Sequence, residues 1–229
     1  MSVRASDPEP GEAGSLRDNA LMVLTVIMVS ALAAALLGFV HTRTREPIER
    51  SRRQELVQAL GLVLPAHDNR PESTARPVAG AGSACALRRF TATRDGRVSG
   101  YALQTCTTQG FGPMIHLLVG ATPEGQITGV YILAHQETPG LGAKITEDQE
   151  RFPRWREECA QQDCSGRRPF LRQFALRRAE ACRFQVRKDG GEIDAITAST
   201  ISSRAVAEAV GASVAVLQRE AQAAPGDPR

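Results

Sequence analysis

The sequence predicts an α+β protein with a single N-terminal transmembrane helix, followed by an antiparallel sheet with packed helices. Three observations lead to this fold class. An uncharged apolar run extends from Ala20 to Val40, four short strand-like runs separated by turn residues follow residue 83, and an amphipathic run extends from Ser203 to Glu220. The length of each run suits the element that it predicts.

Composition limits the chain to one sizeable soluble domain and one additional segment, because 229 residues with 42% apolar content can bury a single core. The 28 basic and 25 acidic residues nearly balance, and the formal net charge is +3. Aromatic residues make up 4% of the chain, which provides few platforms for stacking bases. We therefore expect no nucleic-acid partner.

The chain has five cysteines, which are Cys85, Cys106, Cys159, Cys164 and Cys182. They form no CxxC motif, and no histidine lies near Cys159 and Cys164, so a zinc site is not expected. Outside the cytoplasm one or two disulfides could form, with at least one thiol left over, and Cys159 and Cys164 could close a small loop. Buried thiols are the alternative, and the sequence leaves both open.

Residues 1–18 are predicted to form a disordered tail, because residues 1–15 are rich in Ser, Pro, Glu and Gly and lack periodicity. Residues 19–41 are predicted to form a transmembrane helix, since about 20 residues rising about 1.5 Å each cross a hydrocarbon core of about 30 Å. A cleaved signal peptide and a buried helix are the alternatives, although the apolar region of a signal peptide is shorter.

The flanks of this span differ in positive charge. Two arginines precede the span and five follow it: Arg4 and Arg17, then Arg43, Arg45, Arg50, Arg52 and Arg53. The positive-inside rule would therefore place the C-terminal domain in the cytoplasm.

Residues 42–82 are predicted to form a juxtamembrane helix and a linker. Apolar residues recur at helical spacing between Glu46 and Leu64, with Pro47 near the start and Pro65 at the end. Residues 66–82 are rich in Pro, Gly and Ser, which is typical of a linker or surface loop.

Residues 83–221 are predicted to form the folded domain, and residues 222–229 a disordered C-terminal tail. Short runs rich in β-branched residues predict an antiparallel meander: Cys85–Thr93, Val98–Thr105, Met114–Gly120 and Ile127–Ala134. A helix over Thr146–Gln161 follows, and then a closing hairpin of Phe184–Arg187 and Ile193–Ile196 around a Gly-Gly turn. The amphipathic helix over Ser203–Glu220 ends the domain, with the helices expected on one face of the sheet.

Two motifs in this domain could carry chemistry. Asp194–Ser203 contains five hydroxyl side chains directly ahead of the last helix, where free N–H groups favour anions. A simple helix cap is the alternative, although a cap needs only one hydroxyl. Glu137–Gly142 (ETPGLG) combines a stiff Pro139 with two glycines, and a planar ligand could lie against such a loop. An ordinary Pro-Gly turn is the alternative there.

The order of these features resembles a known family. A meander, then HQETPGLG at 135–142, then DAITASTISS at 194–203, all behind one N-terminal span, resembles the FMN-binding G subunit of the Rnf electron-transport complex. The chain is also similar to the C subunit of the sodium-translocating NADH:quinone reductase. The resemblance extends from the span to about Leu217, and it implies that residues 83–221 form an FMN-binding domain.

In that family a sequence of the type D-x-x-[S/T]-G-A-T-x-[S/T] carries FMN through a phosphoester bond to its threonine. The resemblance implies that Thr200 is the acceptor in this chain, and that Asp194, Thr197 and Ser202 match the other polar positions.

The chain departs from the family's motif at two small residues. Ala198 stands where the family has glycine, and Ser199 stands where it has alanine. Ser199 adds a rival hydroxyl beside the implied acceptor. The resemblance also makes the ETPGLG loop the surface that faces the flavin ring, with Glu137, Thr138, Leu141 and Gly142 as its contacts.

The resemblance further implies a membrane-anchored flavoprotein that relays electrons in an ion-translocating NADH or ferredoxin oxidoreductase. No base or metal that could activate a threonine is visible in the sequence, so attachment implies a separate flavin transferase that uses FAD and Mg²⁺. The family has this domain on the periplasmic side of the bacterial inner membrane, against the arginine count, and its partners are the other membrane subunits and the lipid bilayer. The C subunit of a quinone reductase and a non-redox anchored binding domain are the alternatives.

Overall fold

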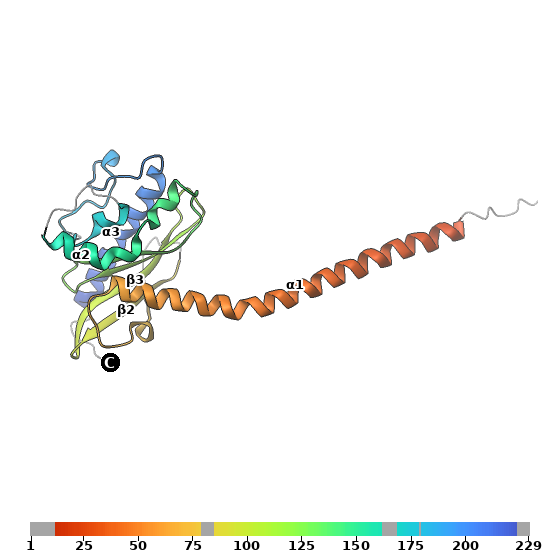
Figure 1. Ribbon diagram of the computed structural model, residues 1–229, viewed down its shortest axis with the longest axis horizontal. Coiled ribbons are helices and arrows are strands. Elements are labelled where there is room, and N and C mark those ends of the chain that lie inside the picture. The colour runs from red at the N-terminus through yellow and green to blue at the C-terminus, as the bar shows by residue number, and fades with distance from the viewer. Residues whose placement is uncertain (1–11, 79–84, 162–168, 179, 224–229) are drawn as a thin grey trace, which may run out of the picture. The chain divides into compact units, whose positions relative to one another are not determined.

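The computed structural model describes residues 12–78, 85–161, 169–178 and 180–223 (Figure 1). The chain forms two compact units, Met1–Arg53 and Gln54–Arg229, which divide within the first helix. The second unit contains the sheet and every short helical segment that follows.

The first helix, α1, extends without interruption over Glu12–Val63. The sequence predicted a transmembrane helix over 19–41 and a separate helix from Glu46, and these prove to be one element that continues through Pro47. Residues 12–18, predicted as tail, are helical, and residues 1–11 lie outside the described part of the chain. The apolar side chains of residues 21–40 are all exposed, and the helix has the length and hydropathy of a membrane span.

The sheet is a five-stranded antiparallel meander in the order β1-β2-β3-β4-β5. Its strands are β1 (Arg76–Val78), β2 (Leu87–Arg94), β3 (Arg97–Thr107), β4 (Ile115–Ala121) and β5 (Ile127–His135). The four predicted strands are confirmed within two residues at each end. The short β1 and a 3₁₀ turn over Pro71–Thr74 fall inside the segment predicted as a linker. β1 escaped prediction because three residues give no periodicity, and only pairing with β2 orders them.

The sheet is covered on both faces, and the prediction of helices on one face is wrong. Side chains alternate along β4, where Leu117 and Val119 join the core under the last helix, α3 (Thr200–Ala223). Leu118 points to the opposite face and packs with Leu60 and Val63, in the last turns of α1. In Figure 1 these last turns, in orange, cross the strands, while α3 is blue.

Two glycines let the end of α1 approach the sheet. Gly120 and Gly129 are directly opposite each other on β4 and β5, and a Cβ on either would overlap the backbone of Val63. The Thr128 hydroxyl donates a hydrogen bond of 2.6 Å to the Val63 carbonyl, which has no partner within its own helix. The last turn of α1 is therefore fixed to the sheet by contact and by a hydrogen bond.

The segment after the sheet differs from the predicted helix over Thr146–Gln161. It contains two 3₁₀ turns, η2 (Gly142–Thr146) and η3 (Gln149–Arg151), and only then the helix α2 (Phe152–Gln161). The α-helix starts at Phe152 because Pro153 has no N–H to donate and suits the first turn of a helix. Between these turns and β5, the Gln149 side chain bonds both backbone groups of Ile132 and so covers part of the sheet edge.

The predicted closing hairpin is wrong. A 3₁₀ turn over Phe170–Phe174 precedes this region, and another, η5, over Arg187–Asp189 occupies the place of the hairpin turn. Only one bridge forms, between Val186 and Ile193, and it is parallel. The reason is local. The N–H groups of residues 189–191 donate hydrogen bonds to the carbonyl groups of residues 186 and 187, so they do not form an antiparallel ladder.

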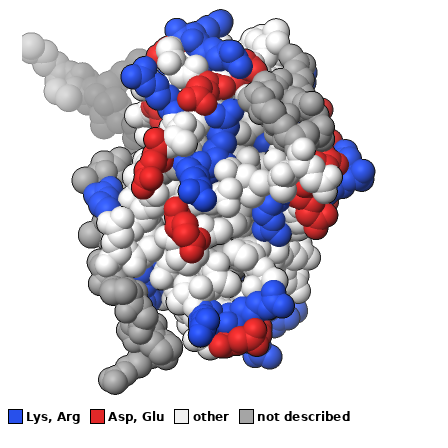
Figure 2. Space-filling view, turned by 90° about the vertical axis from the view of Figure 1, so that its left-hand side faces the viewer, with Lys and Arg blue, Asp and Glu red and all other residues white. Residues whose placement is uncertain are grey.

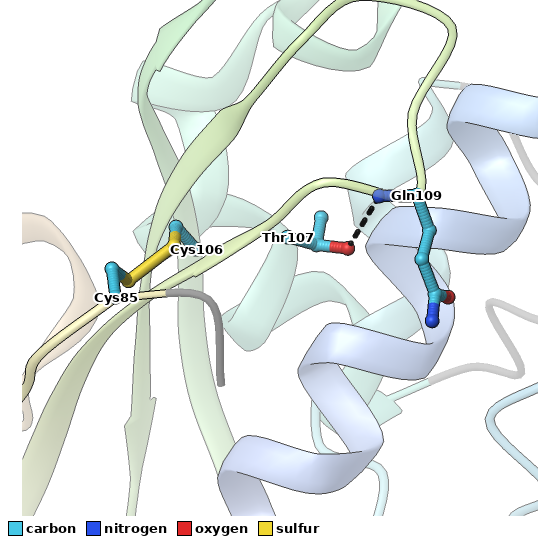
Figure 3. The surroundings of a disulfide bond; sticks show 4 residues. All are labelled: Cys85, Cys106, Thr107 and Gln109. Carbon is cyan, nitrogen blue, oxygen red and sulfur yellow. Dashed lines mark hydrogen bonds between the residues drawn. A yellow bond between two sulfur atoms is a disulfide. The ribbon is translucent and has the colours of Figure 1, made fainter. Parts of the chain in front are cut away.

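The structure decides the state of four cysteines that the sequence left open. Cys85 and Cys106 form a disulfide that joins the segment before β2 to the end of β3 (Figure 3). Cys159 is also disulfide-bonded, and its predicted partner, Cys164, lies outside the described residues. Cys182 is a free, half-buried thiol.

Candidate functional site

The N-terminus of α3 is closed by serine hydroxyl groups. Ser199 precedes the first helical residue, and its carbonyl accepts both the Ser203 N–H at 3.1 Å and the Ser203 hydroxyl at 2.8 Å. The Ser203 oxygen in turn accepts the Ile196 N–H at 2.9 Å. Ala198, just before the turn, has φ of +62°, a left-handed conformation that costs energy for a residue with a Cβ. α3 therefore begins at Thr200, earlier than the predicted Ser203.

A buried carboxylate joins the two motifs. Glu137 is 5% exposed, and its Oε2 accepts a hydrogen bond of 2.6 Å from the Ser202 hydroxyl, 65 residues later in the chain. Its Oε1 accepts the Gly112 N–H at 3.0 Å. The Ser199 hydroxyl donates to the Ser202 oxygen at 3.1 Å and extends this chain of hydrogen bonds. The ETPGLG loop, the loop after β3 and the start of α3 thus meet at one side chain.

Glycines make room for this carboxylate. A Cβ on Gly110 would lie 2.5 Å from Oε1 of Glu137, and a Cβ on Gly142 would lie 2.5 Å from Oε2. Either methyl group would displace the carboxylate or its loop. The two glycines are thus explained by close packing rather than by turn conformation.

The loop that carries Gly110 and Gly112 is anchored at its start. β3 ends at Thr107, next to the disulfide-bonded Cys106, and the Thr107 hydroxyl oxygen accepts the Gln109 N–H at 3.3 Å (Figure 3). The disulfide and this turn therefore fix the strand from which the loop departs.

A pocket of about 130 Å³ opens where these segments meet. It is lined by Phe111, Glu137, Thr138, Leu141, Gly142, Ala198, Ser199, Thr200, Ile201 and Ser202. Three of these are large apolar side chains with high exposure: Phe111 at 72%, Ile201 at 48% and Leu141 at 43%. They are the only exposed large apolar side chains in the described residues beyond α1. Their convergence on one hollow indicates a binding site for a ligand with an apolar body.

Six of the eight site residues predicted from the sequence line this pocket, namely Glu137, Thr138, Leu141, Gly142, Thr200 and Ser202. Thr197 and Asp194 do not. Asp194 forms an ion pair of 2.6 Å with Arg187, and its backbone is held on both sides by the Gln173 amide. The Gln173 amide therefore holds the backbone that leads to α3, and the Asp194 side chain pairs with Arg187 outside the pocket.

Four lining residues were not predicted, and they are Phe111, Ala198, Ser199 and Ile201. Of these four, Phe111 had the clearest sequence signal, because a loop between two strands does not itself require an aromatic residue between two glycines. Ile201 gave none, since an apolar residue in the first turn of a helix is expected to face the core.

Charged side chains near the start of α3 are paired. Arg204 donates two hydrogen bonds to Asp189, of 2.5 and 2.9 Å, and these hold the pKa of the Asp189 carboxyl below its usual value. On the face drawn in Figure 2, basic and acidic side chains are interspersed rather than gathered by sign. The described residues contain no group of three or more potential metal ligands.

Comparison with known proteins assigns the class of this site. The profile of the FMN-binding domain family matches residues 110–215, which include both motifs and the Phe111 loop. The G subunit of the ion-translocating oxidoreductase complex of Vibrio cholerae serotype O1 (strain M66-2) is 32% identical over 216 residues, covering 91% of this chain and 93% of that protein. The same subunit from Cereibacter sphaeroides is 31% identical over 218 residues, covering 94% and 92%. That of Aliivibrio fischeri (strain ATCC 700601 / ES114) is 32% identical over 192 residues, covering 82% and 84%.

The fold and site therefore define an FMN-binding domain that follows an N-terminal apolar helix. The chain belongs to the family formed by the G subunits of ion-translocating oxidoreductase complexes.

Proposed function

We propose that the chain is a membrane-anchored flavoprotein that carries FMN on Thr200 and relays electrons within an Rnf-type ion-translocating NADH or ferredoxin oxidoreductase complex. The observation that carries this proposal is the pocket at the start of α3, which Thr200 and the ETPGLG loop line together. Membership of the G-subunit family supports the complex and the class of reaction. When bound, FMN supplies the electron-transfer chemistry, and the chain supplies its position and surroundings.

The hydrogen bonds around α3 favour Thr200 over its rival hydroxyls as the acceptor. Ser202 is 1% exposed and donates to Glu137, and Ser199 is 7% exposed and donates to Ser202. Ser203 is fully buried in the cap. Thr200 is half-buried at the first helical position and lines the pocket, whereas the exposed Thr197 does not line it. Among the hydroxyls of this motif, Thr200 is therefore the one that lines the pocket without being buried.

The residues present suit FMN. A phosphate on Thr200 would lie at the N-terminus of a 24-residue helix, where free N–H groups and the dipole stabilise negative charge. Phe111, Leu141 and Ile201 would provide apolar contacts for the flat ring, and Thr138 would provide a polar one. Ala198 lines the pocket and is exposed, so it is not buried against the surrounding chain.

Attachment requires a second protein, because no base reaches the Thr200 hydroxyl in the hydrogen bonds of the described residues. A flavin transferase using FAD and Mg²⁺ would break the phosphoanhydride bond of FAD and form the phosphoester to the threonine oxygen. AMP would leave, and the hydroxyl proton would pass to a base of the transferase. The other partners are the membrane subunits of the complex and the lipid bilayer around α1.

We further propose that the domain lies on the periplasmic side of the bacterial inner membrane. The Cys85–Cys106 disulfide and the disulfide at Cys159 favour this side, because disulfides persist in oxidising compartments. The arginines after the span favour the opposite side, but a charge bias is weak for one span that assembles with partner subunits.

Flavin fluorescence in a denaturing gel tests the attachment. Membranes from cells that contain the transferase are compared for wild type, Thr200→Ala and Ser199→Ala. We expect fluorescent bands for wild type and Ser199→Ala and a dark band for Thr200→Ala, with an FMN-phosphate mass on the Thr200 peptide. Fluorescence that survives Thr200→Ala would refute Thr200 as the attachment residue. A colourless wild type would refute the proposal that the chain is a flavoprotein.

The C subunit of a quinone reductase is the second candidate, and the proteins that copurify with the chain discriminate between the two. The names of the similar proteins favour the ion-translocating oxidoreductase complex. A non-redox binding domain predicts a colourless protein in which Thr200→Ala has no effect beyond a small change in stability.

A further inference from the structure

Glu137 has surroundings that a purely structural carboxylate does not require. Both of its oxygens accept hydrogen bonds, from the Gly112 N–H and the Ser202 hydroxyl, which is the arrangement of an ionised carboxylate. Both donors are neutral, and none of the ion pairs found among the described residues includes Glu137. The negative charge is therefore buried without a cation.

The fold stabilises this charge in two ways. Ser202 is the third residue of α3, so the carboxylate lies beside the first turn of the helix, where the dipole favours an anion. Gly110 and Gly142 leave the space that the two oxygens fill, and any side chain there would remove it. An apolar residue in place of Glu137 would avoid the cost of burying a charge, so the charge itself needs an explanation.

We propose that Glu137 sets the redox potential of the flavin by holding a fixed negative charge at the wall of its pocket. This inference rests on the proposed function, because it requires FMN among the lining residues. Reduction adds negative charge to the ring system, and a nearby carboxylate opposes that charge. Burial strengthens the effect, because water screens a carboxylate that is only 5% exposed less than it screens a surface one. Glu137 thus lowers the midpoint potential of the bound flavin and makes it a stronger reductant.

No atom is transferred to or from Glu137 in this role. The electrons come from the redox partner in the complex, or from the reductant in a titration, and the accompanying protons come from solvent. Glu137 is a tuning residue, and Ser202 and Gly112 position it.

The test is a redox titration of the full-length flavoprotein, purified with its FMN, in wild type and Glu137→Gln. Glutamine keeps both hydrogen bonds, since its oxygen can accept the Gly112 N–H while its amide donates to the Ser202 oxygen, and only the charge is lost. Glu124→Gln is the matched control, because Glu124 is exposed in the β4–β5 turn, at the opposite end of β5 from Glu137.

We expect a higher midpoint potential in Glu137→Gln, at full flavin content, with wild-type values in Glu124→Gln and near-wild-type values in the charge-retaining Glu137→Asp. An unchanged potential in a fully loaded Glu137→Gln protein would overturn the inference and leave the proposed function intact. Loss of flavin from a folded Glu137→Gln protein would also overturn it, because the carboxylate would then serve attachment. A wild type without FMN would refute the proposed function instead.

Ser202→Ala decides the question if Glu137→Gln does not fold. Ser202→Ala keeps the negative charge of Glu137 and removes one of the two hydrogen bonds that the carboxylate accepts, so the charge is less well stabilised. The expected result is a midpoint potential below that of wild type. A potential equal to or above wild type would overturn the inference.

Discussion

Substituting Gly129 by alanine tests how the last turn of α1 is fixed to the sheet. The new Cβ would overlap Val63 Cα, and it would lie 2.7 Å from Val63 Cβ and 3.0 Å from Val63 Cγ1, whereas carbon atoms pack at about 3.5–4.0 Å. The turn must move by about 1 Å. Overpacking of this kind costs about 1–3 kcal/mol. The move also stretches the hydrogen bond from Thr128 to the Val63 carbonyl, at a cost of about 1 kcal/mol.

Two effects of opposite sign determine the net change. Alanine lowers the entropy of the unfolded chain relative to glycine, and this stabilises the folded state by about 0.5–1 kcal/mol. The expected net destabilisation is therefore about 1–3 kcal/mol, or roughly 3–10 °C in the midpoint of thermal unfolding for a domain of this size.

Thermal unfolding of the full-length chain in detergent, followed by tryptophan fluorescence, measures this change. Trp155 is the single tryptophan and is buried in the core under α3, so its emission reports unfolding of the domain. Gly61→Ala is the matched control, because Gly61 is an exposed residue of α1 with no atom within 4 Å of the new Cβ. It should stabilise the helix by about 0.5–1 kcal/mol. A Gly129→Ala midpoint at or above that of wild type would refute the contact with Val63.

Three further predictions concern stability. Ala198→Gly should stabilise the domain by about 0.5–1 kcal/mol in urea unfolding, because glycine relieves the left-handed φ of +62° at that residue; a loss of stability would argue against that conformation. Replacing both Cys85 and Cys106 by serine should cost about 3 kcal/mol, since the disulfide closes a loop with a sequence separation of 21, and reductant should then have a smaller effect on the midpoint. The lowered pKa of Asp189 means that its pair with Arg204 stabilises the fold above the unfolded carboxyl pKa of about 4 and that this contribution is lost as the pH falls through the folded value. Arg204→Ala should therefore reduce the fall in urea midpoint on acidification, and an unchanged acid dependence would contradict this assignment.

Local chemistry accounts for the parts of the fold that the sequence predicted well. The four long strands follow from runs of β-branched residues bounded by turn residues, and Asp95-Gly96 adopts the positive φ values that a tight hairpin needs. The apolar run in α1 has the length of a membrane span. The start of α2 was misplaced because Thr146–Arg151 has helical polarity, yet Pro153 and the left-handed Asp148 set the first helical turn at Phe152.

Local chemistry also explains why only part of the site was predicted from the sequence. The hydroxyl cluster at the start of α3 and the ETPGLG loop each have a local signature, and their order in the chain pointed to one family. Phe111 stands out in the sequence only as an aromatic residue between two glycines, and its place at the pocket depends on the hydrogen bond between Gly112 and Glu137. Asp194 matched the motif by position but faces Arg187 instead of the pocket.

The sequence by itself determined the four long strands, the apolar N-terminal helix and the family, because periodicity, turn residues and short motifs are properties of neighbouring residues. Only the tertiary structure decided that Ser199 and Ser202 are buried in hydrogen bonds, since Ser202 donates to a carboxylate 65 residues away in the chain and Ser199 donates to Ser202. It also decided that Gly120 and Gly129 serve a helix contact on the second face of the sheet. Contacts between distant segments depend on how the faces of the sheet are covered, and no local pattern encodes that.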